Sequence, residues 1–261
     1  IALLVVDLFL TVNPTQHTAP GSPSVFWPRP AWLEPLLAEP HSRFDSQNLF
    51  HANVGEIYDL QDIRGISPLK PASAAAYEGL PRRLRWQLLN VTHVLAPEPL
   101  ESGLRPLMPI TESIVPGETV DATLYRFEDA LPRAWLSTEP LFAPDNDAAL
   151  QAIQSPDFDP AQHVVLPAAA ESQVSDMVPT ADPGEVIISH VPRGLDITVD
   201  ANASSLLVIS EFFRSGWRAT VDGEPVTLLE ADAGLMAISV PAGRHAITLR
   251  FRPLDVPLGA A

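Results

Sequence analysis

The sequence contains no cysteine, so it can form neither a disulfide framework nor a zinc site with thiolate ligands. Basic residues are also scarce: 16 Lys and Arg stand against 32 Asp and Glu, which gives a formal net charge of −16. Because proteins that bind nucleic acid neutralise phosphates with Lys and Arg, we expect no nucleic-acid partner. The 28 prolines indicate many loops and strand ends rather than long helices.

Familiar catalytic motifs are missing as well. The chain has no G-x-S-x-G, no H-E-x-x-H and no glycine-rich phosphate loop. Its seven histidines lack the i, i+4 spacing of metal ligands on one helix. The acidic residues that invite a calcium site lack the five-ligand spacing with a closing Glu, namely Asp145, Asp147, Asp157 and Asp159. We therefore predict no catalytic residue, no metal site and no cofactor in this chain.

Residues 206–253 carry the clearest structural pattern, a series of short strand patterns separated by turn residues. Trp217 alternates with Arg218, so the Trp is expected to face the core and the Arg the opposite side of the sheet. Asp222-Gly223 is well suited to the positive backbone angles of a tight hairpin turn. Such a series is typical of an antiparallel β-sandwich.

The same stretch carries a family resemblance. S-E-F-F-R-S-G-W-R-A-T-V-D-G (Ser210–Gly223) and V-P-A-G-R-H-A-I-T-L-R-F-R-P (Val240–Pro253) resemble the C-terminal signature of the YfhO family. Residues 53–69 resemble a second family block, N-x-G-x-x-Y-x-x-x-D-x-x-G-x-x-P-L. The family comprises large bacterial integral membrane proteins that are similar to polytopic glycosyltransferases with lipid-phosphate-sugar donors.

Both ends of the chain are predicted to lie at a membrane. The chain opens on the apolar run Ile1–Leu10, which as a helix covers about 15 Å of a hydrocarbon core about 30 Å thick. We predict that residues 1–12 are the end of a truncated transmembrane helix, although a buried strand or core helix is the alternative. The family resemblance favours the membrane helix, and residues 255–261 resemble the lead-in to a further one.

Between these ends we expect two domains and an α+β fold. Residues 13–158 are predicted to form a mixed α/β domain, and residues 159–254 an antiparallel, jelly-roll-like β-sandwich. Helices are predicted at 31–38, at two places within 71–90, and at 145–155 with Asp145 as its cap. Strands are predicted at 91–96, 119–127, 133–137, 164–166, 186–189, 195–201 and 206–210.

Five residues are candidates for glycan binding. Asn53, Tyr58 and Asp62 can offer hydrogen bonds to sugar hydroxyls and an aromatic face, and Arg214 and Arg218 lie within the C-terminal signature. The structural alternative is that Asp62 caps a turn and Tyr58 packs in the core.

Further aromatic and basic residues also allow two interpretations. Trp27 and Trp32 either lie in the headgroup region of the membrane or cover the core of the first domain. Similarly, the arginine run at Arg82, Arg83 and Arg85 either meets lipid phosphates or forms a solvated face with carboxylate partners.

The resemblance implies an extracytoplasmic domain in the bacterial plasma membrane. Such a domain is expected to assist transfer of a sugar from a polyprenyl-phosphate donor to a cell-envelope glycopolymer, by recognising or positioning the acceptor. Its partners are then an envelope glycan or lipid-linked sugar, and the membrane through flanking helices. The alternatives are a non-catalytic carbohydrate-binding β-sandwich and a structural lid on the membrane part.

Overall fold

The computed structural model of the chain describes residues 29–39, 41–49, 54–64, 71–112, 119–174 and 177–252. The predictions for residues 1–12 and 255–261, for Trp27 and for Asn53 fall outside the described residues. Within the described ranges, no helix is both long and apolar enough to cross a bilayer.

The fold is mostly β with predominantly antiparallel pairing, which agrees with the predicted α+β class. The first half contains η1 (Ala31–Leu33), α3 (Glu34–Leu37), β1 (Arg43–Asp45), η2 (Val54–Tyr58), β2 (Gln61–Asp62), α4 (Ala72–Glu78), α5 (Arg82–Leu88), β3 (Val91–Ala96), β4 (Leu104–Ile110) and β5 (Ala122–Phe127). The predicted helices within 71–90 and the predicted strand at 91–96 are therefore confirmed.

The second half contains β6 (Ala134–Ser137), β7 (Glu139–Ala143), α6 (Asn146–Ala152), β8 (His163–Pro167), η3 (Ala168–Gln173), β9 (Gly184–Val191), β10 (Gly194–Ala201), β11 (Ser205–Ile209), β12 (Trp217–Val221), β13 (Glu224–Val226), β14 (Leu229–Ala231), β15 (Leu235–Val240) and β16 (Gly243–Phe251). The predicted cap of α6 is confirmed, because the Asp145 carboxylate accepts a 2.8 Å hydrogen bond from the Ala148 N–H.

The first sheet has the order β2-β1-β3-β5-β4. β1 pairs in parallel with β2 and β3, whereas β5 pairs antiparallel with β3 and β4. Edge strand β4 was not predicted, because Pro106 and Pro109 interrupt its pattern; prolines are tolerated at a sheet edge, where no further strand needs their N–H.

A hydrophobic cluster on the first sheet places Trp32 in the core. Trp32 is only 4% exposed and packs with Leu33 and Leu36 against sheet residues Phe44 and Leu124. The interpretation of Trp32 as a core residue is thus the one that the structure supports.

Two further sheets contribute to one hydrophobic cluster in the second half. The five-stranded sheet has the order β13-β12-β16-β10-β9 and the four-stranded sheet the order β14-β15-β11-β6. Their shared cluster contains Val199, Ala219 and Leu249 from the first of these sheets and Leu207 and Ile238 from the second. Asp222 and Gly223 have φ of 53° and 89°, as the predicted hairpin turn between β12 and β13 requires.

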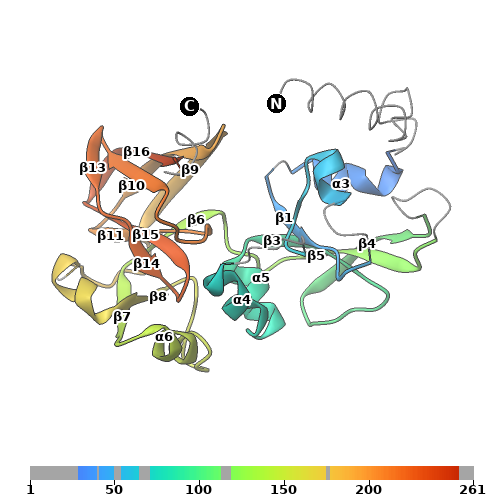
Figure 1. Cartoon of the computed structure of the whole chain (residues 1–261), viewed down its shortest axis with the longest axis horizontal. Helices are drawn as coiled ribbons and strands as arrows, with labels where there is room; N and C mark the ends of the chain where they lie inside the picture. The colour runs from blue at the N-terminus through green and yellow to red at the C-terminus, as the bar shows by residue number, and fades with distance from the viewer. Residues whose placement is uncertain are drawn as a thin grey trace, which may run out of the picture.

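The largest cluster joins the two halves of the chain. It contains Tyr77 of α4, Trp86 of α5, Trp135 of β6 and Leu235 of β15. Figure 1 shows α4 and α5 between the first sheet and the later sheets. Strand pairing also crosses residue 158, because β6 pairs with β11. The predicted domain boundaries stay a prediction.

A buried carboxylate lies at the turn between β14 and β15. Asp232 is fully buried; its Oδ1 accepts a 2.8 Å hydrogen bond from the Val165 N–H, while its Oδ2 has no partner among the described residues. The Tyr77 hydroxyl donates to the Asp232 carbonyl at 2.7 Å, which ties this turn to α4. Burial raises the pKa of the Asp232 carboxyl to about 7.

We predict that Asp232→Asn removes part of the pH dependence of stability. Because the folded pKa lies above the unfolded value of 3.8, the contribution of Asp232 is complete below pH 3.8 and is lost as the pH rises through about 7. Between pH 5 and 8 the wild type should lose about 2 to 3 kcal/mol of unfolding free energy relative to the variant. Urea unfolding across this range measures the difference. Asp200→Asn, at an exposed position on β10, is the control; parallel profiles for all three proteins would contradict the assignment.

Candidate functional site

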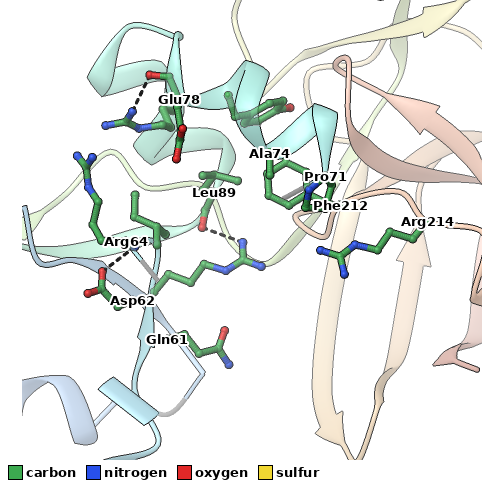
Figure 2. A pocket seen from close by; sticks show the side chains of 13 residues that line it. Gln61, Asp62, Arg64, Pro71, Ala74, Glu78, Leu89, Phe212 and Arg214 are labelled. Atoms are coloured by element: carbon green, nitrogen blue, oxygen red, sulfur yellow. Dashed lines mark hydrogen bonds between the residues drawn. The ribbon is translucent and has the colours of Figure 1, made fainter. Parts of the chain in front are cut away.

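A cavity of about 320 Å³ lies where β2, α4 and α5 meet the loop that follows β11. Figure 2 shows Gln61, Asp62 and Arg64 on one side of it and Phe212 and Arg214 on another. We call it the arginine cavity, because its lining includes Arg43, Arg64, Arg85 and Arg214.

A buried ion cluster joins the two sides behind this cavity. Arg43 of β1 lies 3.5 Å from the Glu211 carboxylate, and Arg133 donates a short hydrogen bond to the same carboxylate. Arg43 also donates to the Leu89 carbonyl at 3.1 Å and to the Ser210 hydroxyl at 2.9 Å. Residues 210–211, at the start of the loop after β11, are thereby held against β1 and the end of α5.

The charges of this cluster stabilise one another. Burial alone raises the pKa of Glu211, but the positive charges of Arg43 and Arg133 outweigh burial and hold this pKa below its ordinary value. Burial and then Arg133 lower the pKa of Arg43 to about 9, so Arg43 still carries its charge at neutral pH. The cluster is therefore ionised under ordinary conditions.

Asp45 fixes a second arginine of the cavity. Its fully buried carboxylate accepts two hydrogen bonds from Arg64, at 2.7 and 3.1 Å, and one from the Trp86 indole at 2.8 Å. A guanidinium held by two parallel bonds has a fixed direction. The hydrogen bonds with Asp45 also raise the pKa of Arg64.

Arg85 is the most buried arginine of the cavity, with 8% of the residue exposed. It donates to the Glu78 carbonyl at 3.0 Å, and its Nη2 lies 3.9 Å from the Asp45 carboxylate. Its Nε has no hydrogen-bond partner among the described residues. Burial, followed by the nearby charge of Arg64, lowers its pKa. The positive charges on this side of the cavity therefore repel one another.

Arg214 and Phe212 form the opposite side. The Arg214 side chain is exposed and points toward the cavity in Figure 2. Within the part of the chain that the structure describes, its guanidinium makes no hydrogen bond or ion pair. The Phe212 ring packs edge-on against Tyr77, with centroids 5.3 Å apart, and lines the same cavity as Arg214.

The structure brings two of the five predicted glycan-binding residues, Asp62 and Arg214, to the same cavity. Asp62 also caps a turn, as the structural alternative proposed, because its Oδ1 accepts from the Ser46 and Arg64 N–H groups at 3.3 and 3.0 Å. Burial raises its pKa. Tyr58 does not line this cavity and packs against the hydrophobic cluster of the first sheet.

Arg218 lies outside the arginine cavity. It lines a second cavity of about 410 Å³ together with Arg214, but its guanidinium donates to the carbonyls of Ser215 and Trp217 at 2.6 and 2.7 Å. Its donors are thus partly occupied by its own loop. Its role in glycan binding stays a prediction, as does that of Asn53, which lies outside the described residues.

Arg43, Arg64 and Phe212 were not predicted as site residues from the sequence, and Arg85 was not distinguished from Arg82 and Arg83. The carboxylate partners expected for the arginine run are present: Arg82 lies 3.4 Å from Glu101 and Arg83 2.5 Å from Asp129. Arg85 differs because it lies on the inner side of α5. The spacing of the arginine run gave no local signal for this difference.

We predict that Asp45→Asn lowers the unfolding free energy by about 3 to 5 kcal/mol, because it leaves the Arg64 and Arg85 charges without their buried partner. Urea denaturation followed by tryptophan fluorescence measures this change. Asp129→Asn breaks an exposed pair with Arg83 and should cost less than about 1 kcal/mol. Similar losses in the two variants would show that Asp45 does not organise the site.

Comparison with known proteins finds a family match for one region of the chain. Residues 163–261 match the family model described as bacterial membrane protein YfhO. This range includes Phe212 and Arg214 of the cavity, whereas the cavity residues from β1, β2, α4 and α5 precede it. No curated protein and no solved structure matches the chain.

Proposed function

Since residues 163–261 make this chain a member of the YfhO family of bacterial membrane proteins, we propose that it recognises and positions the acceptor glycan in a sugar transfer. In this proposal the chain faces the outside of the plasma membrane. The sugar comes from a polyprenyl-phosphate donor, and the membrane-embedded part of the protein carries the chemistry.

The arginine cavity is the observation that carries the proposal. Its volume of about 320 Å³ lies at the lower end of the range for small-molecule sites, which suits one or two sugar rings. The Phe212 ring offers an apolar face, and Gln61 and Asp62 offer polar groups for hydroxyls. Sugars combine an apolar ring face with a rim of hydroxyls, so this mixture of groups fits them.

The architecture of the second half is consistent with this role. We interpret its five-stranded and four-stranded sheets as a jelly-roll-like β-sandwich, because residues from both share one hydrophobic cluster. The loop that carries Phe212 and Arg214 connects β11 of one sheet to β12 of the other. A rigid pair of sheets then presents this loop to the first sheet and its helices.

Two alternatives remain in different functional classes. A non-catalytic carbohydrate-binding β-sandwich uses the same cavity without taking part in transfer. A structural lid binds no sugar and packs on the membrane part instead. Leu141 and Phe142 of β7 favour the lid, because they are 41% and 38% exposed and border a groove of about 490 Å³.

Calorimetric titration of the 261-residue chain with fractionated bacterial envelope glycans tests the proposal. We expect saturable binding to at least one fraction. Phe212→Ala should weaken it by about fivefold or more, because contact with an aromatic face contributes about 1 kcal/mol. Phe142→Ala, which removes an exposed aromatic ring away from the cavity, is the matched control and should bind like the wild type.

Thermal unfolding of each variant confirms that it is folded. Absence of binding to every fraction by the folded wild type would favour the lid. Equal losses in Phe212→Ala and Phe142→Ala would remove the cavity from the proposal.

A further inference from the structure

The lining of the arginine cavity has more basic than acidic residues, in contrast to the chain as a whole. The whole sequence has twice as many acidic as basic residues and a net charge of −16. In the cavity lining, however, four arginines stand against the two carboxylates of Asp62 and Glu78. A concave surface with an excess of positive groups attracts ligands that carry negative charge.

Three of these arginines are held in place by the protein. Arg64 is fixed by the Asp45 carboxylate, and Arg43 by Glu211 together with the Leu89 carbonyl. Arg85 is anchored through the Glu78 carbonyl. Their orientations are set before any ligand arrives, which reduces the entropy that binding must overcome.

Arg214 differs from these three. Its side chain is exposed, and among the described residues it has neither a carboxylate nor a carbonyl partner. Its guanidinium retains all five donors in a planar fork, an arrangement that matches a carboxylate in two parallel hydrogen bonds. A bound anion would therefore make its main contact with Arg214.

The electrostatics of the lining define the charge of that anion. The lowered pKa values of Arg43 and Arg85 follow from burial and then from neighbouring arginines, so a negative group in the cavity would relieve this repulsion. Asp62 and Glu78 face the same space and oppose a group with two negative charges. A single negative charge is the best match.

We propose that the arginine cavity binds an acidic sugar, with its carboxylate paired to Arg214 and its ring against Phe212. This inference rests on the proposed function and narrows the acceptor to a glycan that carries uronic-acid-type residues. A sugar of this type has one carboxylate beside an apolar ring face. The adjacent Arg214 and Phe212 can recognise these two groups together.

Two disaccharides that differ in one group test the inference. Cellobiouronic acid carries one carboxylate, and cellobiose has a hydroxymethyl group at the same carbon. Calorimetry with the full chain should give about tenfold tighter binding of the acid, and this preference should fall as salt rises. Arg214→Gln should reduce the preference to twofold or less. Arg244→Gln, which removes another exposed arginine at the far end of β16, should keep it.

The outcomes separate the two proposals. If both disaccharides bind equally and Arg214→Gln changes neither, the acidic-sugar inference is wrong while glycan binding stands. If neither disaccharide nor any envelope fraction binds, both proposals fail. Cellobiose 6′-phosphate, which carries up to two negative charges, should bind more weakly than the acid. Tighter binding of this phosphate would overturn the single-charge assignment.

Discussion

Glu211 lies between Arg43 and Arg133, and this buried ion cluster is the contact on which the arrangement of the site depends. Arg43 belongs to β1 of the first sheet, whereas Glu211 begins the loop that carries Phe212 and Arg214. Buried ion pairs add little net stability, because desolvation offsets their attraction. Their contribution here is geometric, because leaving either charge unpaired would cost free energy. The cluster therefore favours one arrangement of β1 and the loop after β11.

The hydrophobic core supports the same junction. Tyr77 of α4 lies in the largest cluster, donates to the Asp232 carbonyl and packs against Phe212. Asp45 holds Arg64 and Trp86 on the side of the first sheet. Several side chains that line the cavity are thus fixed by buried contacts, whereas Arg214 is not. A site of this kind is largely formed before its ligand binds, and only the free arginine must adjust.

Much of the fold could be predicted because its signals are local. The alternation that placed Trp217 and Ala219 on the core face is confirmed by their packing, and the α6 cap at Asp145 follows from a single side chain. Strand β4 was missed because its prolines oppose the local pattern. Asp62 and Arg214 were each predicted as candidates, but their common cavity follows from tertiary contacts between distant segments. Arg43 and Arg64 carried no local signal at all, because their roles depend on carboxylates elsewhere in the chain.

The most direct test of this account asks whether α4 and the loop after β11 face each other across the cavity. Since the chain has no cysteine, two can be introduced without interference. The double variant Ala74→Cys, Arg214→Cys places one thiol on each side of the cavity. In the control, Ala75→Cys with Arg214→Cys, the first thiol lies at the exposed neighbouring position, which does not line the cavity. With a short bifunctional thiol reagent, the account predicts rapid intramolecular cross-linking of the first pair and slow cross-linking of the second. Equal rates for both pairs would contradict it.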